Sequence, residues 1–284
     1  MNNKVKSAVV LFIYKKDNSL VEILEKIAEF KPDKLYVVSD IGATEGETLM
    51  IEKNRSTVKN YTTTVNTIWI QPPTHQGIIK IFDYALEIVF EQEEQAIILE
   101  DDTIPSPLFF EFCSDMLNKY RTDQSIGSII GTNLGAVNAQ NQYFKSIIGL
   151  PYWGWATWAD RWKKMPKDYA FWDTYAQSTE FKELLQVEHP FSSSFIRNRQ
   201  LPKSWDLKWA MYQLSANMKS IIPGINLITN NGYNELATFT KLENSMFANI
   251  QFINLANENL NIENKSLTEN YCLYQKKFIS EFNK

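Results

Sequence analysis

The chain has few of the residues on which several common kinds of site depend. Its 284 residues include two cysteines, Cys113 and Cys272, and two histidines, His75 and His189. The cysteines are far apart and lack the spacing of zinc ligands, which argues against a disulfide framework and a zinc site and favours a reducing cytosol. Because only two histidines are present, a hydrolytic serine–histidine triad is also not expected.

The sequence also lacks a strong excess of one charge and a long apolar run. Its 29 basic and 33 acidic residues give a formal net charge of −4 and a pI near 5.4, so a general nucleic-acid binder is not expected. The first apolar run, residues 7–14, is too short to span a membrane. We therefore expect a cytoplasmic protein with no transmembrane segment, and peripheral association with the inner face of the membrane stays open.

What is present is typical of a globular protein with alternating strands and helices. Hydrophobic residues make up 44% and aromatic residues 13%. Short apolar runs predict strands at 7–14, 35–39, 67–70, 96–99 and 126–130. Helical spacing predicts helices at 20–30, 77–90, 109–120 and 205–218, with Asn18 or Ser19 capping the first and Ser204 capping the last. This alternation predicts an α/β fold with a Rossmann-like, mixed but mostly parallel sheet flanked by helices.

Three adjacent acids end the fourth predicted strand. The apolar run 96–99 is followed directly by Glu100, Asp101 and Asp102. Ligands of open α/β sheets bind beyond the carboxyl ends of the strands, and a hard cation such as Mn²⁺ or Mg²⁺ prefers oxygen ligands. Asp102 is the predicted metal ligand; Glu100 shares its face, and Asp101 points the other way as a supporting acid near the nucleotide. The simpler alternative is a solvated turn.

Four segments in fixed order resemble one glycosyltransferase family. Residues 97–102, followed by Pro105, Pro107, Phe109 and Phe110, resemble the metal-binding segment of N-acetylglucosaminyltransferase I, a GT-A glycosyltransferase. Residues 75–81, 149–155 and 204–209 resemble, in turn, its helix-opening, acceptor-side and catalytic-base segments. The Trp-Gly-Trp-Ala-Thr-Trp and Trp-Asp-x-x-Trp blocks are still more similar to bacterial GT-A-like proteins described as hemolysin-related.

This resemblance implies an inverting, metal-dependent glycosyltransferase. The donor would be a UDP-sugar, most plausibly an N-acetylhexosamine, and the acceptor a hydroxyl of a glycan or lipid-linked saccharide. Asp206 would be the catalytic base, and Glu100 would orient the donor or acceptor. Taken by itself, Asp206 is better explained as an acid in the first turn of a helix, and only the resemblance favours a catalytic role; Trp172–Asp173 is a competing Trp-Asp pair.

Several residues are predicted to contact the nucleotide. Asp40 follows the second predicted strand, where its carboxylate can accept a hydrogen bond from a uracil imide. Tyr14 and Lys16 follow the first strand, where they can flank the base or the phosphates, and the resemblance assigns a base contact to Tyr84. An exposed lysine and a half-buried helix aromatic are the plain alternatives for Lys16 and Tyr84.

An aromatic block is the predicted acceptor side. Flat indole rings stack on sugars, so we assign acceptor or sugar contacts to Trp153, Gly154, Trp155 and Trp205. The alternative is a core in which Trp155, Trp158 and Trp162 share one face of a helix, with one or two of the aromatic residues meeting a sugar.

We expect a single domain of two abutting halves. Residues 1–103 would bind the nucleotide-sugar, residues 104–240 would supply the acceptor side and the catalytic base, and residues 241–284 would form a tail with a helix near 269–282.

The chain departs from the bacterial group at two positions. Lys16 stands where those proteins usually have arginine, and Phe239 stands where they tend to have histidine, so that Thr238 or Thr240 would have to make the phosphate or metal contact. These departures keep a non-catalytic sugar- or nucleotide-binding protein in view. A sugar nucleotidyltransferase is the other rival, although residues 11–16 contain no glycine-rich phosphate loop.

Overall fold

One large sheet runs through the molecule. The computed structural model describes residues 7–16, 18–133, 142–146, 152–186, 204–232 and 263–264. Nine strands of these residues form a sheet in the order β11-β7-β9-β6-β8-β4-β1-β2-β3. They are β1 Ala8–Ile13, β2 Leu35–Ser39, β3 Thr67–Ile70, β4 Gln95–Glu100, β6 Ile126–Ile130, β7 Gln142–Ser146, β8 Trp155–Trp158, β9 Lys219–Pro223 and β11 Glu263–Asn264. A separate antiparallel pair joins β5 (Thr103–Pro105) to β10 (Ile228–Asn230).

The sheet is mixed but mostly parallel, which confirms the predicted α/β class. Strands β3, β2, β1 and β4 are parallel neighbours. Strand β8 lies antiparallel between β4 and β6, while β6 and β9 are parallel. Since β1 and β4 lie side by side with Phe12 opposite Glu100, their carboxyl ends open at the same edge of the sheet.

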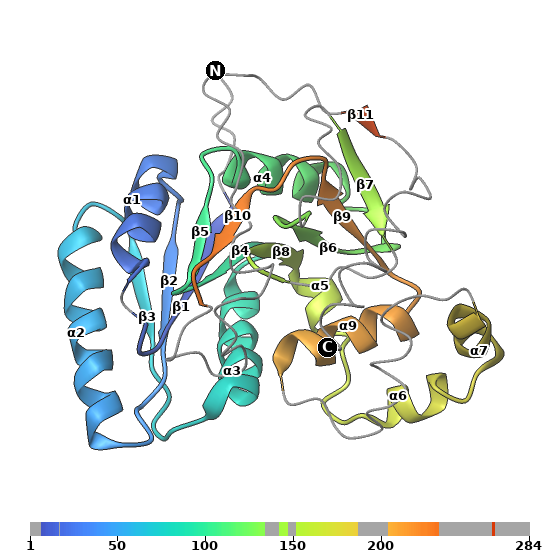
Figure 1. Cartoon of the computed structure of the whole chain (residues 1–284), viewed down its shortest axis with the longest axis horizontal. Coiled ribbons are helices and arrows are strands. Elements are labelled where there is room, and N and C mark those ends of the chain that lie inside the picture. Colours follow the sequence, from blue (N-terminus) through green and yellow to red (C-terminus); the bar gives the residue numbers. More distant parts are fainter. Residues whose placement is uncertain are drawn as a thin grey trace.

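Helices cover both faces of this sheet (Figure 1). Buried side chains of α1 and α4 belong to the core on one face, and those of α3 and α9 to the core on the other. The helices are α1 Leu20–Phe30, α2 Glu45–Tyr61, α3 Gly77–Gln92, α4 Phe109–Lys119, α5 Ala159–Trp162, α6 Ala170–Tyr175, α7 Thr179–Gln186 and α9 Trp205–Ser215. Within the described ranges, no helix combines the length and apolar character that a membrane crossing requires.

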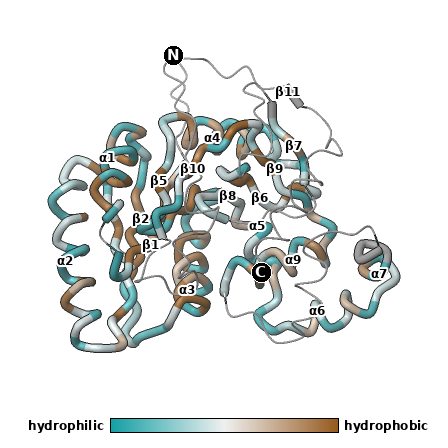
Figure 2. The backbone as a smooth tube through the Cα atoms, viewed as in Figure 1, coloured by the Kyte–Doolittle hydropathy of each residue, from teal (hydrophilic) through white to brown (hydrophobic). Residues whose placement is uncertain are grey.

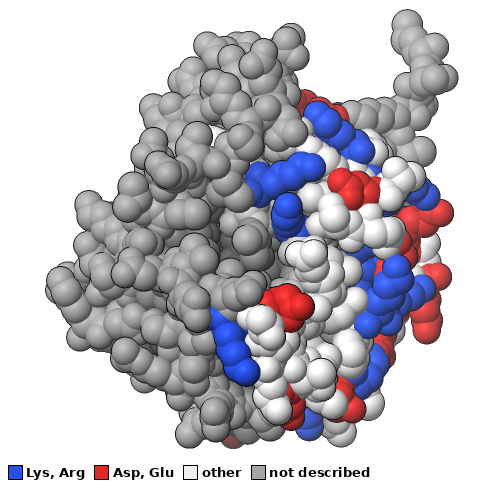
Figure 3. Space-filling model, turned by 90° about the vertical axis from the view of Figure 1, so that its right-hand side faces the viewer, with Lys and Arg blue, Asp and Glu red and all other residues white. Residues whose placement is uncertain are grey.

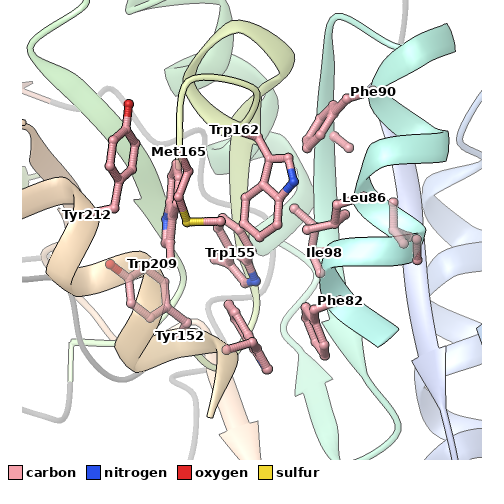
Figure 4. Close-up of a cluster of buried hydrophobic side chains, with 14 of the residues drawn as sticks. Phe82, Leu86, Phe90, Ile98, Tyr152, Trp155, Trp162, Met165, Trp209 and Tyr212 are labelled. Atoms are coloured by element: carbon pink, nitrogen blue, oxygen red, sulfur yellow. The ribbon is translucent and has the colours of Figure 1, made fainter. Parts of the chain in front are cut away.

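The alternation along β4 separates the two cores. Ile98 packs with α3 and α9, whereas Ile97 and Leu99 pack with α1 and α4. Figure 4 shows Ile98 beside Phe82 of α3 and close to the tryptophans of the same core. Glu100 continues the face of Ile98 and therefore leaves the strand on the side of α3 and α9.

The structure corrects three expectations. The tryptophans predicted to share a helical face lie instead on strand β8 (Trp155–Trp158) and on the short helix α5, although all three are buried. Helix α2 was not predicted, because its sequence is largely polar, as its colours in Figure 2 show. Helix α9 ends at Ser215 rather than at residue 218, since Asn217 has a φ of 51° and turns the chain into β9. The tail helix predicted near 269–282 lies outside the described residues.

Candidate functional site

Asp101 ties the end of β4 to the loop that follows β1. Its Oδ2 accepts the backbone N–H groups of Tyr14 and Lys16 at 2.7 and 3.3 Å. From the other side, the Asn54 Nδ2 of α2 donates to the carbonyls of the same two residues at 3.0 and 2.9 Å. Burial and the charge of Asp102 raise the pKa of Asp101 to about 7, against the opposing effect of these N–H groups. The loop at residues 14–16 is thus held from both sides.

Lys16 extends from this loop onto the predicted metal ligand. Its ammonium forms an ion pair with the Asp102 carboxylate, and both side chains are largely buried. Burial lowers the pKa of Lys16, but the charges of Asp102, Asp101 and Glu100 outweigh it and raise the pKa overall. The lysine therefore stays charged at the end of β4.

The chain after β10 covers this ion pair. Asn231 donates its backbone N–H to the Asp102 carbonyl at 2.9 Å, which brings residues 230–232 against the acidic segment. A Cβ on Gly232 would collide with the Asp102 Oδ2, the Asn230 Oδ1 and the Lys16 Nζ. Only a glycine leaves room for these groups to converge. Asn230 and Gly232 were not predicted as site residues, although Asn-Asn-Gly after an apolar segment marks a turn.

Glu100 and Asp206 influence each other electrostatically. Burial raises the pKa of Glu100 well above its ordinary value, and the nearby charges of Asp102 and Asp206 raise it further, against the effect of Lys16. The Asp206 charge also adds to the effect of burial in raising the pKa of Tyr152. The fold thus brings Asp206 within electrostatic reach of a strand end 106 residues earlier in the sequence.

Asp206 itself lies in the first turn of α9. Its Oδ1 accepts the Leu207 N–H at 2.9 Å, and its carboxylate is also hydrogen-bonded to the side chain of Ser204. Burial outweighs these bonds and raises the pKa of Asp206. Ser204 is the N-cap residue as predicted, but its side chain bonds Asp206 rather than a backbone N–H. The competing acid, Asp173, is exposed on α6.

Asp40 closes the N-terminus of α3. Its carboxylate accepts the backbone N–H groups of Gln76 and Gly77 at 3.0 and 2.9 Å, and that of Ile41 at 2.8 Å. His75 lies beside it, with its Nδ1 3.2 Å from the Asp40 Oδ2 and 2.6 Å from the Ile41 carbonyl. Asp40 thus has a structural role of its own, and the predicted contact with a uracil imide remains a proposal.

Tyr14 lies at the same edge of the sheet. Its hydroxyl donates to the Glu47 Oε2 at 3.0 Å, while Lys15 pairs with the other oxygen of Glu47 at 2.9 Å. Burial, followed by this hydrogen bond, raises the pKa of Tyr14 to about 12. Tyr84 is half-buried on α3, where it packs against the core shared with α9.

The predicted acceptor-side aromatics divide into buried and accessible groups. Trp155 and Trp205 are 1% and 5% exposed, and their rings stack at 5.2 Å in the core. Buried rings cannot lie against a sugar, which leaves Trp153, half-buried beside them, as the aromatic with open surface. Gly154 has a φ of 70° and packs so closely on Ile228 that a Cβ would not fit.

The donor set at Asp102 fits a hard cation bound mainly through its substrate. Within the described part of the chain, no group of three or more His, Cys, Asp and Glu side chains could hold a metal ion. Two oxygen ligands do lie against Gly232: the Asp102 Oδ2, which pairs with Lys16, and the Asn230 Oδ1, which accepts the Gly232 N–H at 2.6 Å. One or two protein oxygens suffice when a diphosphate and waters complete the coordination. Thr238 and Phe239 lie outside the described residues.

Comparisons with known proteins give a weak likeness in fold. No protein-family model matches the chain, and no curated protein matches it. A mannosyltransferase from Pyrobaculum calidifontis in complex with GDP-Man and Mn²⁺ is 12% identical, with a TM-score of 0.37, and the match covers 76% of this chain and 74% of that one. A mannose-1-phosphate geranyltransferase from Thermus thermophilus is 9% identical, with a TM-score of 0.42 and coverage of 77% and 74%.

A further match has a similar level of likeness. A 4-diphosphocytidyl-2C-methyl-D-erythritol synthase from Anaerococcus prevotii is 12% identical, with a TM-score of 0.35 and coverage of 61% of this chain and 78% of that one. At such identities and TM-scores, the likeness carries no argument about the substrate or the reaction of this chain.

Proposed function

We propose that the chain is an inverting, metal-assisted glycosyltransferase that transfers a sugar from a nucleotide diphosphate donor to a hydroxyl acceptor. The observation that carries this proposal is the acidic end of β4, where Asp102 pairs with Lys16 and Asp101 accepts the backbone N–H of Tyr14. Transfer from a diphosphate to a hydroxyl requires positive charge at the diphosphate and a carboxylate that takes the hydroxyl proton, and Asp206 at the start of α9 is the candidate for the second role.

The residues divide between donor and acceptor. Asp102 and Asn230 would hold the divalent cation, which supplies positive charge to the departing diphosphate. Tyr14 and Asp40 flank the edge of the sheet where the base would lie. Asp206 would take the proton from the acceptor hydroxyl.

The choice of UDP and of an N-acetylhexosamine rests on the resemblance of four sequence segments to N-acetylglucosaminyltransferase I. A glycan or lipid-linked saccharide is the matching acceptor. Glu100 can hydrogen-bond to the sugar, and Trp153 and the backbone at Gly154 can line the acceptor side.

The direct test is Asp206→Asn, with Asp173→Asn as the matched control. Loss of a general base lowers the rate by roughly 100- to 10,000-fold, so Asp206→Asn should retain binding of UDP with Mn²⁺ but lose transfer. Asp173→Asn changes an exposed acid on α6 and should transfer normally. Transfer is measured as UDP release with an acceptor present, and binding by calorimetry.

The pH dependence gives a second readout of the same residue. A base acts only when deprotonated, and burial raises the pKa of Asp206. Transfer should therefore fall as the pH is lowered, with a midpoint above the ordinary aspartate value of about 3.9. Unchanged turnover in Asp206→Asn would remove Asp206 from the mechanism, and pyrophosphate release from a nucleoside triphosphate and a sugar phosphate would instead identify a nucleotidyltransferase.

A further inference from the structure

We propose that Lys16 is a resident counter-cation of this site: it neutralises Asp102 in the free protein and yields Asp102 to the divalent cation when the diphosphate arrives, which then takes the ammonium. The inference rests on the part of the proposed function in which Asp102 holds a cation for a nucleotide diphosphate. It adds a competition between two cations for one carboxylate.

The backbone of Lys16 is fixed on both sides. Asp101 accepts its N–H and that of Tyr14, and Asn54 donates to the carbonyls of the same two residues. Asn54 is 1% exposed, so this double clamp is protected from water. The loop therefore delivers the lysine side chain to one place, and only the flexible methylene chain can redirect its ammonium.

The Lys16 side chain ends at the Asp102 carboxylate. The Lys16 and Asp102 side chains are 19% and 13% exposed, and the ammonium is paired with the Asp102 Oδ2. The same oxygen, the Asn230 Oδ1 and the ammonium converge on the bare backbone of Gly232. A metal ion that binds these two oxygens must occupy the surroundings of the ammonium.

The charge of Lys16 opposes the binding of a metal ion at Asp102. Lys16 faces the carboxyl groups of Glu100, Asp101 and Asp102, so its charge balances the cluster in the free protein. A divalent cation next to the ammonium is repelled by it, and a few ångströms of separation in a partly buried site make this repulsion significant. A diphosphate removes the conflict, because its oxygens accept from the ammonium while the metal binds Asp102.

The consequence is a pair of effects of opposite sign. Replacing Lys16 by a neutral side chain should strengthen the binding of Mn²⁺ alone, because the competitor and its repulsion are gone. The same change should weaken the binding of UDP in the presence of saturating Mn²⁺, because a phosphate contact is gone. A lysine that merely supports the loop would weaken both.

The experiment titrates Mn²⁺, and then UDP at saturating Mn²⁺, into the full chain by calorimetry. Lys16→Met should bind Mn²⁺ about tenfold more tightly and UDP about tenfold more weakly than the unmodified protein. Lys16→Arg retains the charge and should show no gain in Mn²⁺ affinity. Lys15→Met is the matched control, because the neighbouring lysine pairs with Glu47 instead of Asp102, and both affinities should be unchanged.

Several outcomes would overturn the inference. Equal or weaker Mn²⁺ binding by Lys16→Met, with thermal unfolding showing a folded variant, would mean that the two cations do not compete. Mn²⁺ binding that survives Asp102→Asn would place the ion elsewhere. If Lys16→Met shows both affinity changes but the unmodified protein transfers no sugar, the proposed catalysis is refuted. The competition between Lys16 and the metal ion for Asp102 is then still supported, so the two failures are distinguishable.

Discussion

A side chain larger than that of Gly232 would displace the charged groups around Asp102 more than it would disturb the fold. A Cβ there would meet the Asp102 Oδ2, the Asn230 Oδ1 and the Lys16 Nζ. All three atoms are ends of side chains, which can rotate away at little cost to the fold. The substitution would therefore mainly disturb the ion pair between Lys16 and Asp102.

We therefore predict that Gly232→Ala separates stability from binding. The free energy of unfolding should change by no more than about 1 kcal/mol, while the affinity for UDP with Mn²⁺ should fall by about tenfold or more as the ion pair is pushed aside. Denaturant unfolding and calorimetry measure the two quantities. The control is Gly46→Ala in α2, where a Cβ meets no atom within 4 Å, and binding should be unaffected.

Individual residues differ in how readily the sequence identifies them. Glu100 and Asp102 stand out because carboxylates interrupt an apolar strand, and Asp206 because it lies in a recognisable Trp-Asp block. Asn54 carries no such signal, since it lies within a polar helix and its importance comes from the two carbonyls that it bonds. Its role depends on packing that joins α2 to a loop 38 residues earlier.

At the scale of elements, α9 is the helix on which the proposed base depends. A series of stacked rings joins it to the sheet: Phe12 on Phe82 at 3.7 Å, Phe82 on Trp205 at 4.1 Å and Trp205 on Trp155 at 5.2 Å. These rings span β1, α3, α9 and β8 and fix the end of α9 that carries Asp206. Trp205, predicted to contact a sugar, instead acts from the core by positioning its neighbour.

A buried polar network also holds the C-terminal half of α9, through Gln213 and Trp209. The Gln213 Oε1 accepts from the Ser128 hydroxyl at 2.6 Å, and its Nε2 donates to the hydroxyls of Tyr152 and Ser220, each at 3.3 Å. The Trp209 indole adds a bond to Ser128 at 2.8 Å. Every polar atom of the Gln213 amide thus has a partner on the sheet or beside it.

We predict that Gln213→Met, which keeps the shape but removes these bonds, lowers the free energy of unfolding by about 2 kcal/mol, since the partner groups remain buried. The rate of transfer should fall as well, because α9 carries Asp206. Urea unfolding and UDP release measure the two effects. The exposed Gln177, changed to methionine, should alter stability by less than about 0.5 kcal/mol; a similar loss in both variants would contradict the assignment.

The elements also show which patterns a sequence can resolve. Helix α3 is predicted by the helical spacing of its apolar residues, and strand β4 by a short continuous apolar run that ends in acids. Strand β8 is not predicted, because Trp155, Trp158 and Trp162 recur at a helical interval and suggest one face of a helix instead. Burial on both faces of a central strand removes the alternation that identifies strands, so only pairing with β4 and β6 decided it.

At the scale of the whole molecule, charge is mixed rather than concentrated. On the described part of the face in Figure 3, lysine and arginine side chains are interspersed with aspartate and glutamate. The acids of the candidate site differ because Glu100, Asp101 and Asp102 are adjacent and partly or fully buried. A ligand that brings cations and hydrogen-bond donors to them should therefore stabilise the folded chain as a whole.

We predict a metal-dependent thermal stabilisation by nucleotide-sugars. A ligand that binds only the folded state, at 100 times its Kd, contributes about 2.7 kcal/mol, which raises the Tm of a chain of this size by about 5 °C or more. Screening UDP, GDP and CMP sugars with and without Mn²⁺ by thermal shift should give this rise for one nucleotide and only with the metal. A rise for every nucleotide without Mn²⁺ would contradict metal-assisted donor binding.

The sequence by itself determined the layered α/β fold, because apolar periodicity reports local burial and needs no partner to be interpreted. It also identified Glu100, Asp102 and Asp206 as candidates. Only the tertiary structure brought Asp206 to Glu100, directed Lys16 onto Asp102 and closed Gly232 over the pair. The physical reason is that these contacts join residues far apart in the chain, whose proximity follows from strand order and helix packing rather than from any local preference.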